Sequence, residues 1–203
     1  MKYLRHFIAT LIAVLLIQQT VTAQPPVSII RADSSWGKET FQFPLSFAPE
    51  LKYDGVEEAR FPKDWAKKDS TAFWSYVFAW QLKTTPPLSK ADLEKNLRLY
   101  FDGLMSAVAA VPKEKLPATK AWLQESKKTG DSRLLKGTVE IYDAFTLKEP
   151  LLLYVTIEQT YCNKNKTALL LFRFSPKPPE HLIWKQLNGL TILKELIYKN
   201  QCR

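Results

Sequence analysis

Three β-rich runs in the C-terminal half of the chain constrain the fold most strongly. They are residues 134–143 (LLKGTVEIYD), 151–161 (LLLYVTIEQTY) and 167–175 (TALLLFRFS), separated by the short connections AFTLKEP and CNKNK. Connections of this length join neighbouring antiparallel strands, so the runs predict a three-stranded meander. The rest of the fold has to be built onto this sheet.

The alternation within the runs also predicts how the strands are aligned. Folding the first hairpin about residue 147 places Val139 opposite Val155, and folding the second about residues 163–166 places Val155 opposite Phe174. Both alignments keep apolar side chains on one face of the sheet and polar side chains on the other.

A fourth strand is indicated by residues 71–82, TAFWSYVFAWQL, in which large side chains occupy alternate positions. A period of two residues is typical of a strand, and we interpret this one as buried in the core. The same residues also fit a core helix, or an exposed aromatic platform that holds a ligand. Trp74 and Trp80 are therefore candidate ligand-binding residues, together with Tyr154 in the meander.

Residues 86–112 carry the clearest helix signal. Ser89 is placed to cap the helix with Asp92 as its reciprocal partner, and Pro112 is placed to stop it. Leucine and aromatic residues between these points recur every three or four positions and form one apolar face. This face needs an apolar surface to pack against, and the aromatic strand at 71–82 provides the nearest large apolar surface.

A second helix is predicted to begin after Pro178-Pro179, and the segment after Gly189 fits either helix or strand. The sequence therefore predicts an α+β fold. Its antiparallel sheet comprises the C-terminal meander and the aromatic-rich strand, and two main helices are expected to pack on one face.

The N-terminus has the pattern of a secretory signal peptide over residues 1–23. Lys2 and Arg5 precede an apolar run at 7–17, and small residues follow at Thr22-Ala23. A membrane-spanning helix needs about 20 apolar residues, so this run is too short to remain as an anchor. We expect a secreted or periplasmic protein with no stable membrane anchor after cleavage.

Clusters of proline, glycine and charged residues suggest the domain boundaries. Residues 24–38 are expected to form a flexible leader, followed by a single α+β domain at 39–203. Residues 48–70 mix turn residues with charge and are expected to be irregular. An echo between the two strand, Pro-Pro and helix segments leaves open a pair of pseudo-repeated halves, 39–112 and 113–203.

The net charge is positive, with 29 basic and 20 acidic residues. The basic residues are scattered lysines and do not form a stripe that would follow a phosphate backbone, so nucleic acid is not an expected partner. With six glycines in the whole chain, a phosphate-cradling loop is not expected either, and no cofactor is predicted.

The two cysteines, Cys162 and Cys202, are predicted to form a disulfide because exported proteins meet an oxidising compartment. Two buried thiols are the alternative, since one sequence cannot show that the two residues approach each other.

Candidate catalytic residues are few. His181 is the single histidine of the mature chain, and Glu140 and Glu158 share the polar face of the predicted meander. Such a pair of carboxylates is able to hydrolyse a glycosidic bond, whereas Lys136 and Arg173 are placed to neutralise Glu158 on an ordinary solvated surface. No metal-binding motif is present.

We therefore expect an exported, non-catalytic binding or interaction module. Its ligand would be a protein, a glycan or a small molecule. The alternative is a hydrolase that acts on a polysaccharide or another envelope polymer through paired carboxylates.

Overall fold

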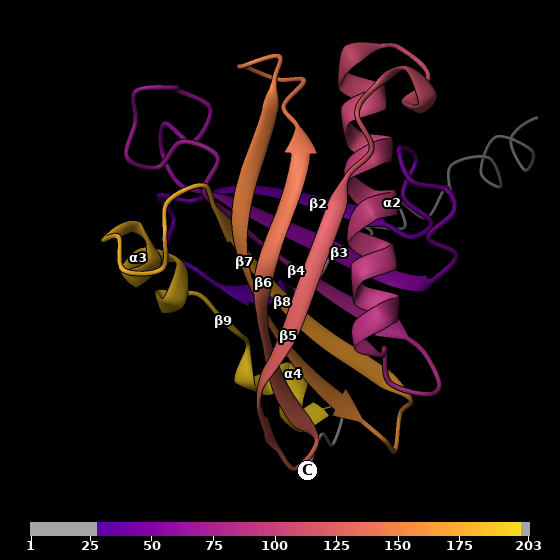
Figure 1. Ribbon diagram of the computed structural model, residues 1–203. Coiled ribbons are helices and arrows are strands. Elements are labelled where there is room, and N and C mark those ends of the chain that lie inside the picture. Colours follow the sequence, from indigo (N-terminus) through magenta and orange to yellow (C-terminus); the bar gives the residue numbers. More distant parts are fainter. Residues whose placement is uncertain (1–27, 200–203) are drawn as a thin grey trace, which may run out of the picture.

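The computed structural model describes residues 28–199 and places seven antiparallel strands in one sheet with the order β2-β3-β4-β8-β7-β6-β5 (Figure 1). In that order the strands are Gly37–Gln42, Asp54–Phe61, Tyr76–Lys83, Thr167–Ser175, Pro150–Cys162, Ser132–Tyr142 and Lys120–Thr129. The predicted α+β class with an antiparallel sheet is confirmed.

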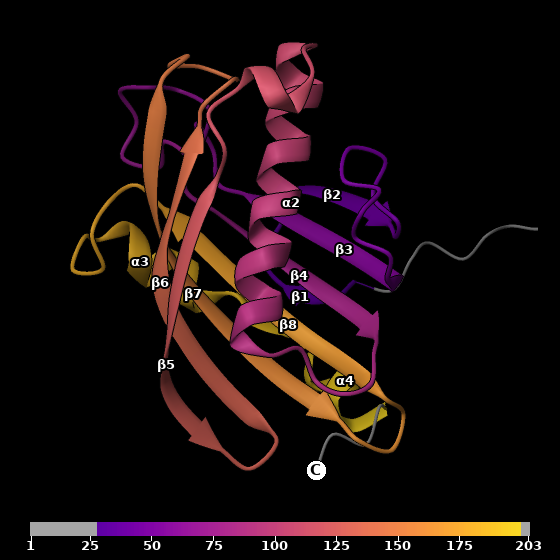
Figure 2. The ribbon, with the colours of Figure 1, turned by 45° about the vertical axis from the view of Figure 1, so that its right-hand side comes forward.

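Helices cover both faces of this sheet (Figure 2). The remaining elements are α2 (Lys90–Ala109), a 3-10 turn (Lys113–Lys115), α3 (Ile183–Gly189), α4 (Lys194–Lys199) and a small sheet of β1 (Ile30–Arg31) paired with β9 (Thr191–Ile192). The expectation that two main helices share one face is not confirmed, because α2 and α3 belong to two different apolar cores.

The central strand β8 explains why both faces need cover. Leu170 and Phe172 lie in the core beneath α2, whereas Leu169 and Leu171 lie in the second core with α3 and α4. A strand that is apolar on both sides is stable only when both faces are shielded from water. The run TALLLFRFS is thus a doubly buried strand.

The aromatic strand is a core strand, as predicted. Phe78 is fully buried and its ring lies 5.0 Å from that of Tyr100 on α2 and 4.5 Å from that of Phe172 on β8. Trp74 lies just before β4, in a turn with a left-handed backbone (φ 51°), yet its side chain joins the same core as Phe78 and Leu97.

The start of α2 is also as predicted. The Ser89 side chain accepts a hydrogen bond from the backbone N–H of Asp92, and the Asp92 carboxylate accepts one from the backbone N–H of Ser89. Leu88 and Leu93 are buried on either side of this cap. The helix ends at Ala109, three residues before Pro112.

The meander has one hairpin in the predicted register and one that is offset. Val155 lies opposite Phe174 as expected, but Val139 lies opposite Leu153 instead of Val155. The offset follows from Asp143, whose carboxylate accepts hydrogen bonds from the backbone N–H groups of residues 145–147 and centres the loop one residue earlier. A shift of two residues keeps every side chain on its expected face.

Three segments are more regular than expected. Residues 48–70, expected to be irregular, contain the whole of β3, and the edge strand β5 was not anticipated. Within the expected flexible leader 24–38, Ile29 and Ile30 are buried and pair with the C-terminal segment. The halves 39–112 and 113–203 share one sheet, because β4 pairs with β8.

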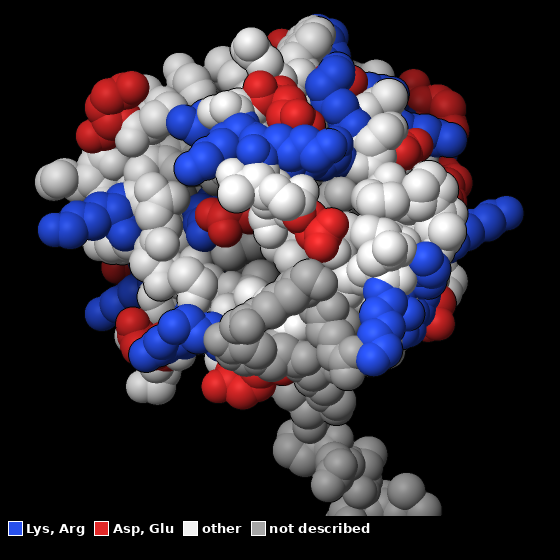
Figure 3. Space-filling view, turned by 90° about the horizontal axis from the view of Figure 1, so that it is seen from below, with Lys and Arg blue, Asp and Glu red and all other residues white. Residues whose placement is uncertain are grey.

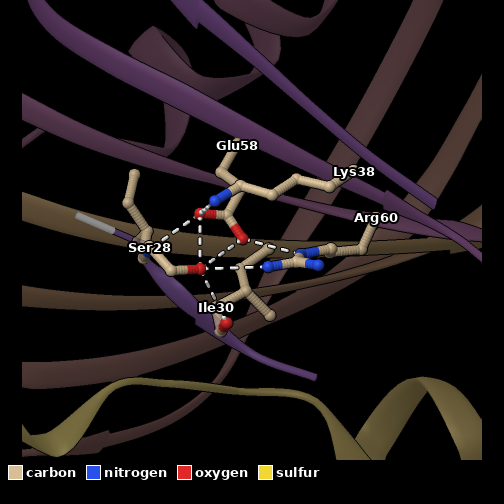
Figure 4. A network of polar contacts seen from close by, with 6 residues as sticks. Ser28, Ile30, Lys38, Glu58 and Arg60 are labelled. Carbon is tan, nitrogen blue, oxygen red and sulfur yellow. Dashed lines mark hydrogen bonds and ion pairs between the residues drawn. The ribbon is translucent and has the colours of Figure 1, made fainter. Parts of the chain in front are cut away.

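A buried carboxylate holds the N-terminal segment in place (Figure 4). Glu58 on β3 is 1% exposed; its oxygens accept hydrogen bonds from the backbone N–H of Ile29 at 2.7 Å and from Arg60 Nε at 2.7 Å. The Ser28 hydroxyl lies 2.9 Å from both oxygens, and Lys38 Nζ lies 3.6 Å from one. The network makes the charge of Glu58 compatible with burial.

Charge is mixed over the face of the molecule seen from below (Figure 3). Lysine and arginine side chains alternate there with aspartate, glutamate and neutral residues. A row of lysine and arginine side chains crosses the upper part of this view, and acidic side chains lie above and below it (Figure 3).

Helix α2 approaches the loop before β3 so closely that Gly103 is required. A Cβ atom at this position would lie 2.0 Å from the carbonyl oxygen of Phe47. We expect Gly103→Ala to lower the free energy of unfolding by about 1 to 3 kcal/mol, although alanine is the better helix former by about 1 kcal/mol. Urea denaturation measures this difference.

Gly189→Ala in α3 is the matched control, because nothing lies within 4 Å of the Cβ position there. It should leave stability unchanged or slightly raised. Equal effects of the two substitutions would show that the close approach of α2 to Phe47 does not determine stability.

Candidate functional site

An aromatic cavity of about 120 Å³ opens at the edge of the α2 side of the sheet. Strands β2, β3 and β4, helix α2 and the loops at 62–74 and 143–149 surround it. Its walls are Glu39, Phe41, Phe47, Glu57, Ala59, Phe61, Trp65, Trp74, Tyr76, Tyr100, Leu104 and Phe145. Apolar walls with a few polar groups are typical of small-molecule sites.

Glu57 is a fully buried carboxyl group in the wall of this cavity. One carboxylate oxygen, Oε2, accepts a hydrogen bond of 2.6 Å from Trp80 Nε1, and the other, Oε1, accepts one of 2.9 Å from the Tyr100 hydroxyl. Both donors are neutral. Glu57 therefore lacks the cationic partners that surround Glu58, the next residue of the same strand.

Burial raises the pKa of the Glu57 carboxyl from 4.5 to about 7. The hydrogen bonds from Trp80 and Tyr100 oppose this rise, and the negative charge of Glu39 adds to it. A carboxyl group that titrates near neutral pH inside a cavity is typical of functional sites, because a charge without a counter-ion destabilises an apolar core.

Two polar atoms of the cavity walls have no hydrogen-bond partner among the described residues. They are the indole Nε1 of Trp74 and the hydroxyl of Tyr76, and both atoms are buried. Burial, reinforced by the charge of Glu57, holds the pKa of the Tyr76 hydroxyl well above its usual value, so this group remains a donor. Unpartnered buried donors are rare and costly, and each calls for an explanation.

The mouth of the cavity is formed by aromatic rings. Phe145 is 40% exposed and lies edge-on to Trp65 at 6.0 Å and to Trp74 at 5.6 Å. The Asp143 hydrogen bonds that set the hairpin register also fix the backbone of this loop. The position of Phe145 is thus determined by the same turn that aligns β6 with β7.

The candidate ligand-binding residues have separate positions. Trp74 lines the aromatic cavity, and Trp80 supports it from the core through its bond to Glu57. Tyr154 lies on the other face of the sheet, in a hollow beside α3. Sequence analysis therefore identified one wall residue of the cavity and one of its supports.

The candidate catalytic residues do not come together. Glu140 on β6 lies opposite Leu152 on β7, and Glu158 lies six residues further along β7. The Cα atoms of the two glutamates are therefore about 20 Å apart. Each carboxylate has its own ion pair, Glu140 with Lys120 at 2.8 Å and Glu158 with Arg173 at 2.6 Å. His181 accepts a hydrogen bond from the backbone N–H of Ile183 at the start of α3.

Sequence analysis missed Glu57, Tyr76 and Tyr100 as site residues. Glu57 stands in a charged segment that resembles a surface loop, but it shares the alternation of Ala59 and Phe61, which places it on the apolar face. A carboxylate in phase with apolar neighbours is the signal that identifies it.

Cys162 is buried at the end of β7, and Cys202 lies outside the described residues, so their disulfide stays a prediction. The proposed signal peptide at 1–23 also lies outside that part of the chain.

Within residues 28–199, no three or more His, Cys, Asp or Glu residues are arranged to hold a metal ion. Over the same residues, no helix has the length and hydropathy needed to cross a membrane. Comparison with known proteins identified no relative: no family model, no curated protein and no solved structure matches the chain.

The raised pKa of Glu57 predicts how stability depends on pH. Because the folded-state pKa of about 7 exceeds the unfolded value of about 4.5, the folded state holds its proton more tightly, and stability falls as the pH rises from 4.5 through 7. The loss amounts to about 3 kcal/mol. We expect Glu57→Gln to remove this loss in urea unfolding measured from pH 4.5 to 8.

Tyr100→Phe removes a donor that stabilises the charged form of Glu57, so it should raise the pKa of Glu57 further. The loss of stability should then continue to a higher pH. An unchanged pH profile in Glu57→Gln would contradict the assignment of the loss to this carboxyl.

Proposed function

We propose that the protein is an exported, non-catalytic binding module whose ligand occupies the aromatic cavity. The observation that carries this proposal is the pair of unpartnered buried donors, Trp74 Nε1 and the Tyr76 hydroxyl, in the cavity wall. A ligand with an acceptor oxygen would give one or both donors the partner that residues 28–199 do not supply.

The charges around the cavity favour a neutral ligand. Glu57 and Glu39 are both acidic, and no basic residue belongs to the wall. A ligand carboxylate would face like charge in a poorly solvated site, whereas a carbonyl or hydroxyl group would accept hydrogen bonds without that penalty. The ligand class proposed is therefore a small aromatic or aliphatic molecule with a neutral acceptor oxygen.

The size of the cavity suits a compact group. A volume of about 120 Å³ is below that of a typical drug-sized site, so the cavity would hold a small molecule or one end of a longer one. The aromatic mouth around Phe145 would contact the part of a longer ligand that remains outside.

Binding is proposed in preference to hydrolysis because of the carboxylate positions. Glycosidases need two carboxyl groups about 5 to 10 Å apart, whereas the Cα atoms of Glu140 and Glu158 lie about 20 Å apart and each carboxylate has an ion pair of its own. Export is supported by the pattern of residues 1–23.

Acetophenone and ethylbenzene test the proposal, because they have similar shapes and only acetophenone offers an acceptor oxygen. We expect acetophenone to shift the indole N–H resonance of Trp74, assigned with Trp74→Phe, and to bind more tightly than ethylbenzene. Tyr76→Phe should weaken acetophenone binding about fivefold, which corresponds to about 1 kcal/mol, and leave ethylbenzene binding unchanged.

The same variant separates binding from structural roles. Because the Tyr76 hydroxyl has no partner in the described part of the chain, Tyr76→Phe should raise the free energy of unfolding by about 1 kcal/mol while it weakens binding. Equal affinities for the two probes, or a Trp74 resonance that neither probe moves, would refute the proposal.

A further inference from the structure

The sheet face opposite α2 is covered by α3, α4 and β1 over the central strands, and it carries exposed side chains over β5, β6 and β7. On these three strands, Val139 and Leu153 lie in the α2 core, so the alternate residues lie on the other face. Among those alternate residues, Trp122 is 54% exposed. We call this region the open face.

The strand register arranges the open face in rows. Trp122, Thr138 and Tyr154 form one cross-strand row, and Gln124, Lys136 and Thr156 form the next. The two aromatic residues are two strands apart, a separation of about 9.5 Å, with a threonine between them. Aromatic and neutral polar side chains thus alternate across the sheet.

Two adjoining hollows run across these rows. One, of about 660 Å³, lies beside Trp122 and Gln124, and the other, of about 490 Å³, extends past Tyr154 to α3 at Asn188. Both are lined by residues 136–138, so they lie side by side on the open face, and we call the two hollows together the cross-sheet groove.

The groove offers hydrogen bonds in a neutral form. Thr138, Gln124 and Asn188 each carry a group that both donates and accepts. The hydroxyl oxygen of Thr156 is buried in the groove wall and has no partner among the described residues. A ligand rich in hydroxyl groups would complement this set.

One positive charge in the groove is unpaired. The carboxylates of β5, β6 and β7 that face solvent are all engaged in ion pairs: Glu125 with Arg133, Glu140 with Lys120, and Glu158 with Arg173. Lys136 is exposed in the middle of the groove and has no ion pair with any residue in 28–199. It would attract an anionic group on the ligand.

We propose that the cross-sheet groove binds a short carbohydrate chain that carries a carboxylate. The C–H faces of the sugar rings stack on Trp122 and Tyr154, the ring hydroxyls bond to the threonine and amide side chains, and the carboxylate pairs with Lys136. This site lies on the opposite face of the sheet from the aromatic cavity and does not depend on it.

Two features favour a carbohydrate over a peptide. A peptide that adds to the edge strand β5 needs free backbone groups, but the N–H of Leu123 on β5 already donates to Glu94, and the N–H of Thr119, just before the strand, donates to Asp102. A protein partner would need a contiguous apolar centre, whereas charged and neutral polar residues interrupt the apolar residues of the groove.

Trigalacturonic acid, cellotriose and triglutamate distinguish the possibilities when they are titrated into the mature protein by calorimetry and followed by the Trp122 indole resonance. We expect trigalacturonic acid to bind and to move that resonance, and cellotriose to bind at the same place more weakly. Tighter binding of triglutamate than of both sugars would overturn the proposal in favour of an acidic peptide.

Matched variants locate the site. Trp122→Ala should weaken trigalacturonic acid binding about tenfold or more, and Lys136→Gln about two- to fivefold. Two control variants should have no effect on sugar binding: Lys95→Gln, at an exposed position of α2, and Phe145→Ala, at the mouth of the aromatic cavity. The proposal fails if neither sugar binds at millimolar concentration, or if Lys95→Gln weakens binding as much as Lys136→Gln does.

Loss of acetophenone binding in Phe145→Ala with sugar binding retained would separate the two sites. Failure of acetophenone to bind would leave the carbohydrate test unaffected, since the two probes report on opposite faces.

Discussion

The central pairing of β4 with β8 is the constraint on which the rest of the structure depends. Both strands carry apolar side chains on both faces, so each face has to be covered by a different part of the chain. The chain after β4 supplies α2 to one face, and the chain after β8 supplies α3 and α4 to the other. The two binding surfaces that we propose, the aromatic cavity and the open face, lie where this cover ends.

Two consecutive glutamates on β3 show how different environments act on the same side chain. Glu58 lies on the face of the sheet opposite α2 and accepts hydrogen bonds from Arg60 and from the N-terminal segment. The positive charge of Arg60 therefore compensates for the burial of Glu58. Glu57 lies on the α2 face with two neutral donors and a pKa of about 7. One carboxylate therefore anchors the fold, and the other is available to respond to a ligand or a proton.

Much of the fold follows from local pattern, and the exceptions have physical causes. The cap at Ser89, a core strand within residues 71–82 (observed at Tyr76–Lys83) and the second hairpin register were predicted, because each depends on residues close in sequence. The position of α3 was not predicted. Helix α3 packs on the face opposite α2 because β8 is apolar on both sides and both of its faces have to be buried. The first hairpin register depended on the side chain of Asp143, which hairpin length alone does not reveal.

The candidate site was harder to predict than the fold because it combines residues from distant segments. Trp74 was identified from its aromatic neighbours, but Glu57 was hidden in a segment whose charge suggested a surface loop. Periodicity shows which face a residue occupies, and it does not show whether a carboxylate on that face finds a counter-ion. For Glu57 that depends on Trp80 and Tyr100, which tertiary structure alone brings within hydrogen-bonding distance.

The cost of the aromatic cavity is the strongest physical argument that it serves a ligand. A buried carboxyl with a raised pKa and two buried donors that have no partner among residues 28–199 all destabilise the fold. The surrounding aromatic core offsets this cost, with Phe78 packed against Tyr100, Phe172 and Phe174. Phenylalanine at position 76 would fill the same space without an unpaired hydroxyl. Packing therefore accounts for the rings of the cavity, and it does not account for their polar atoms.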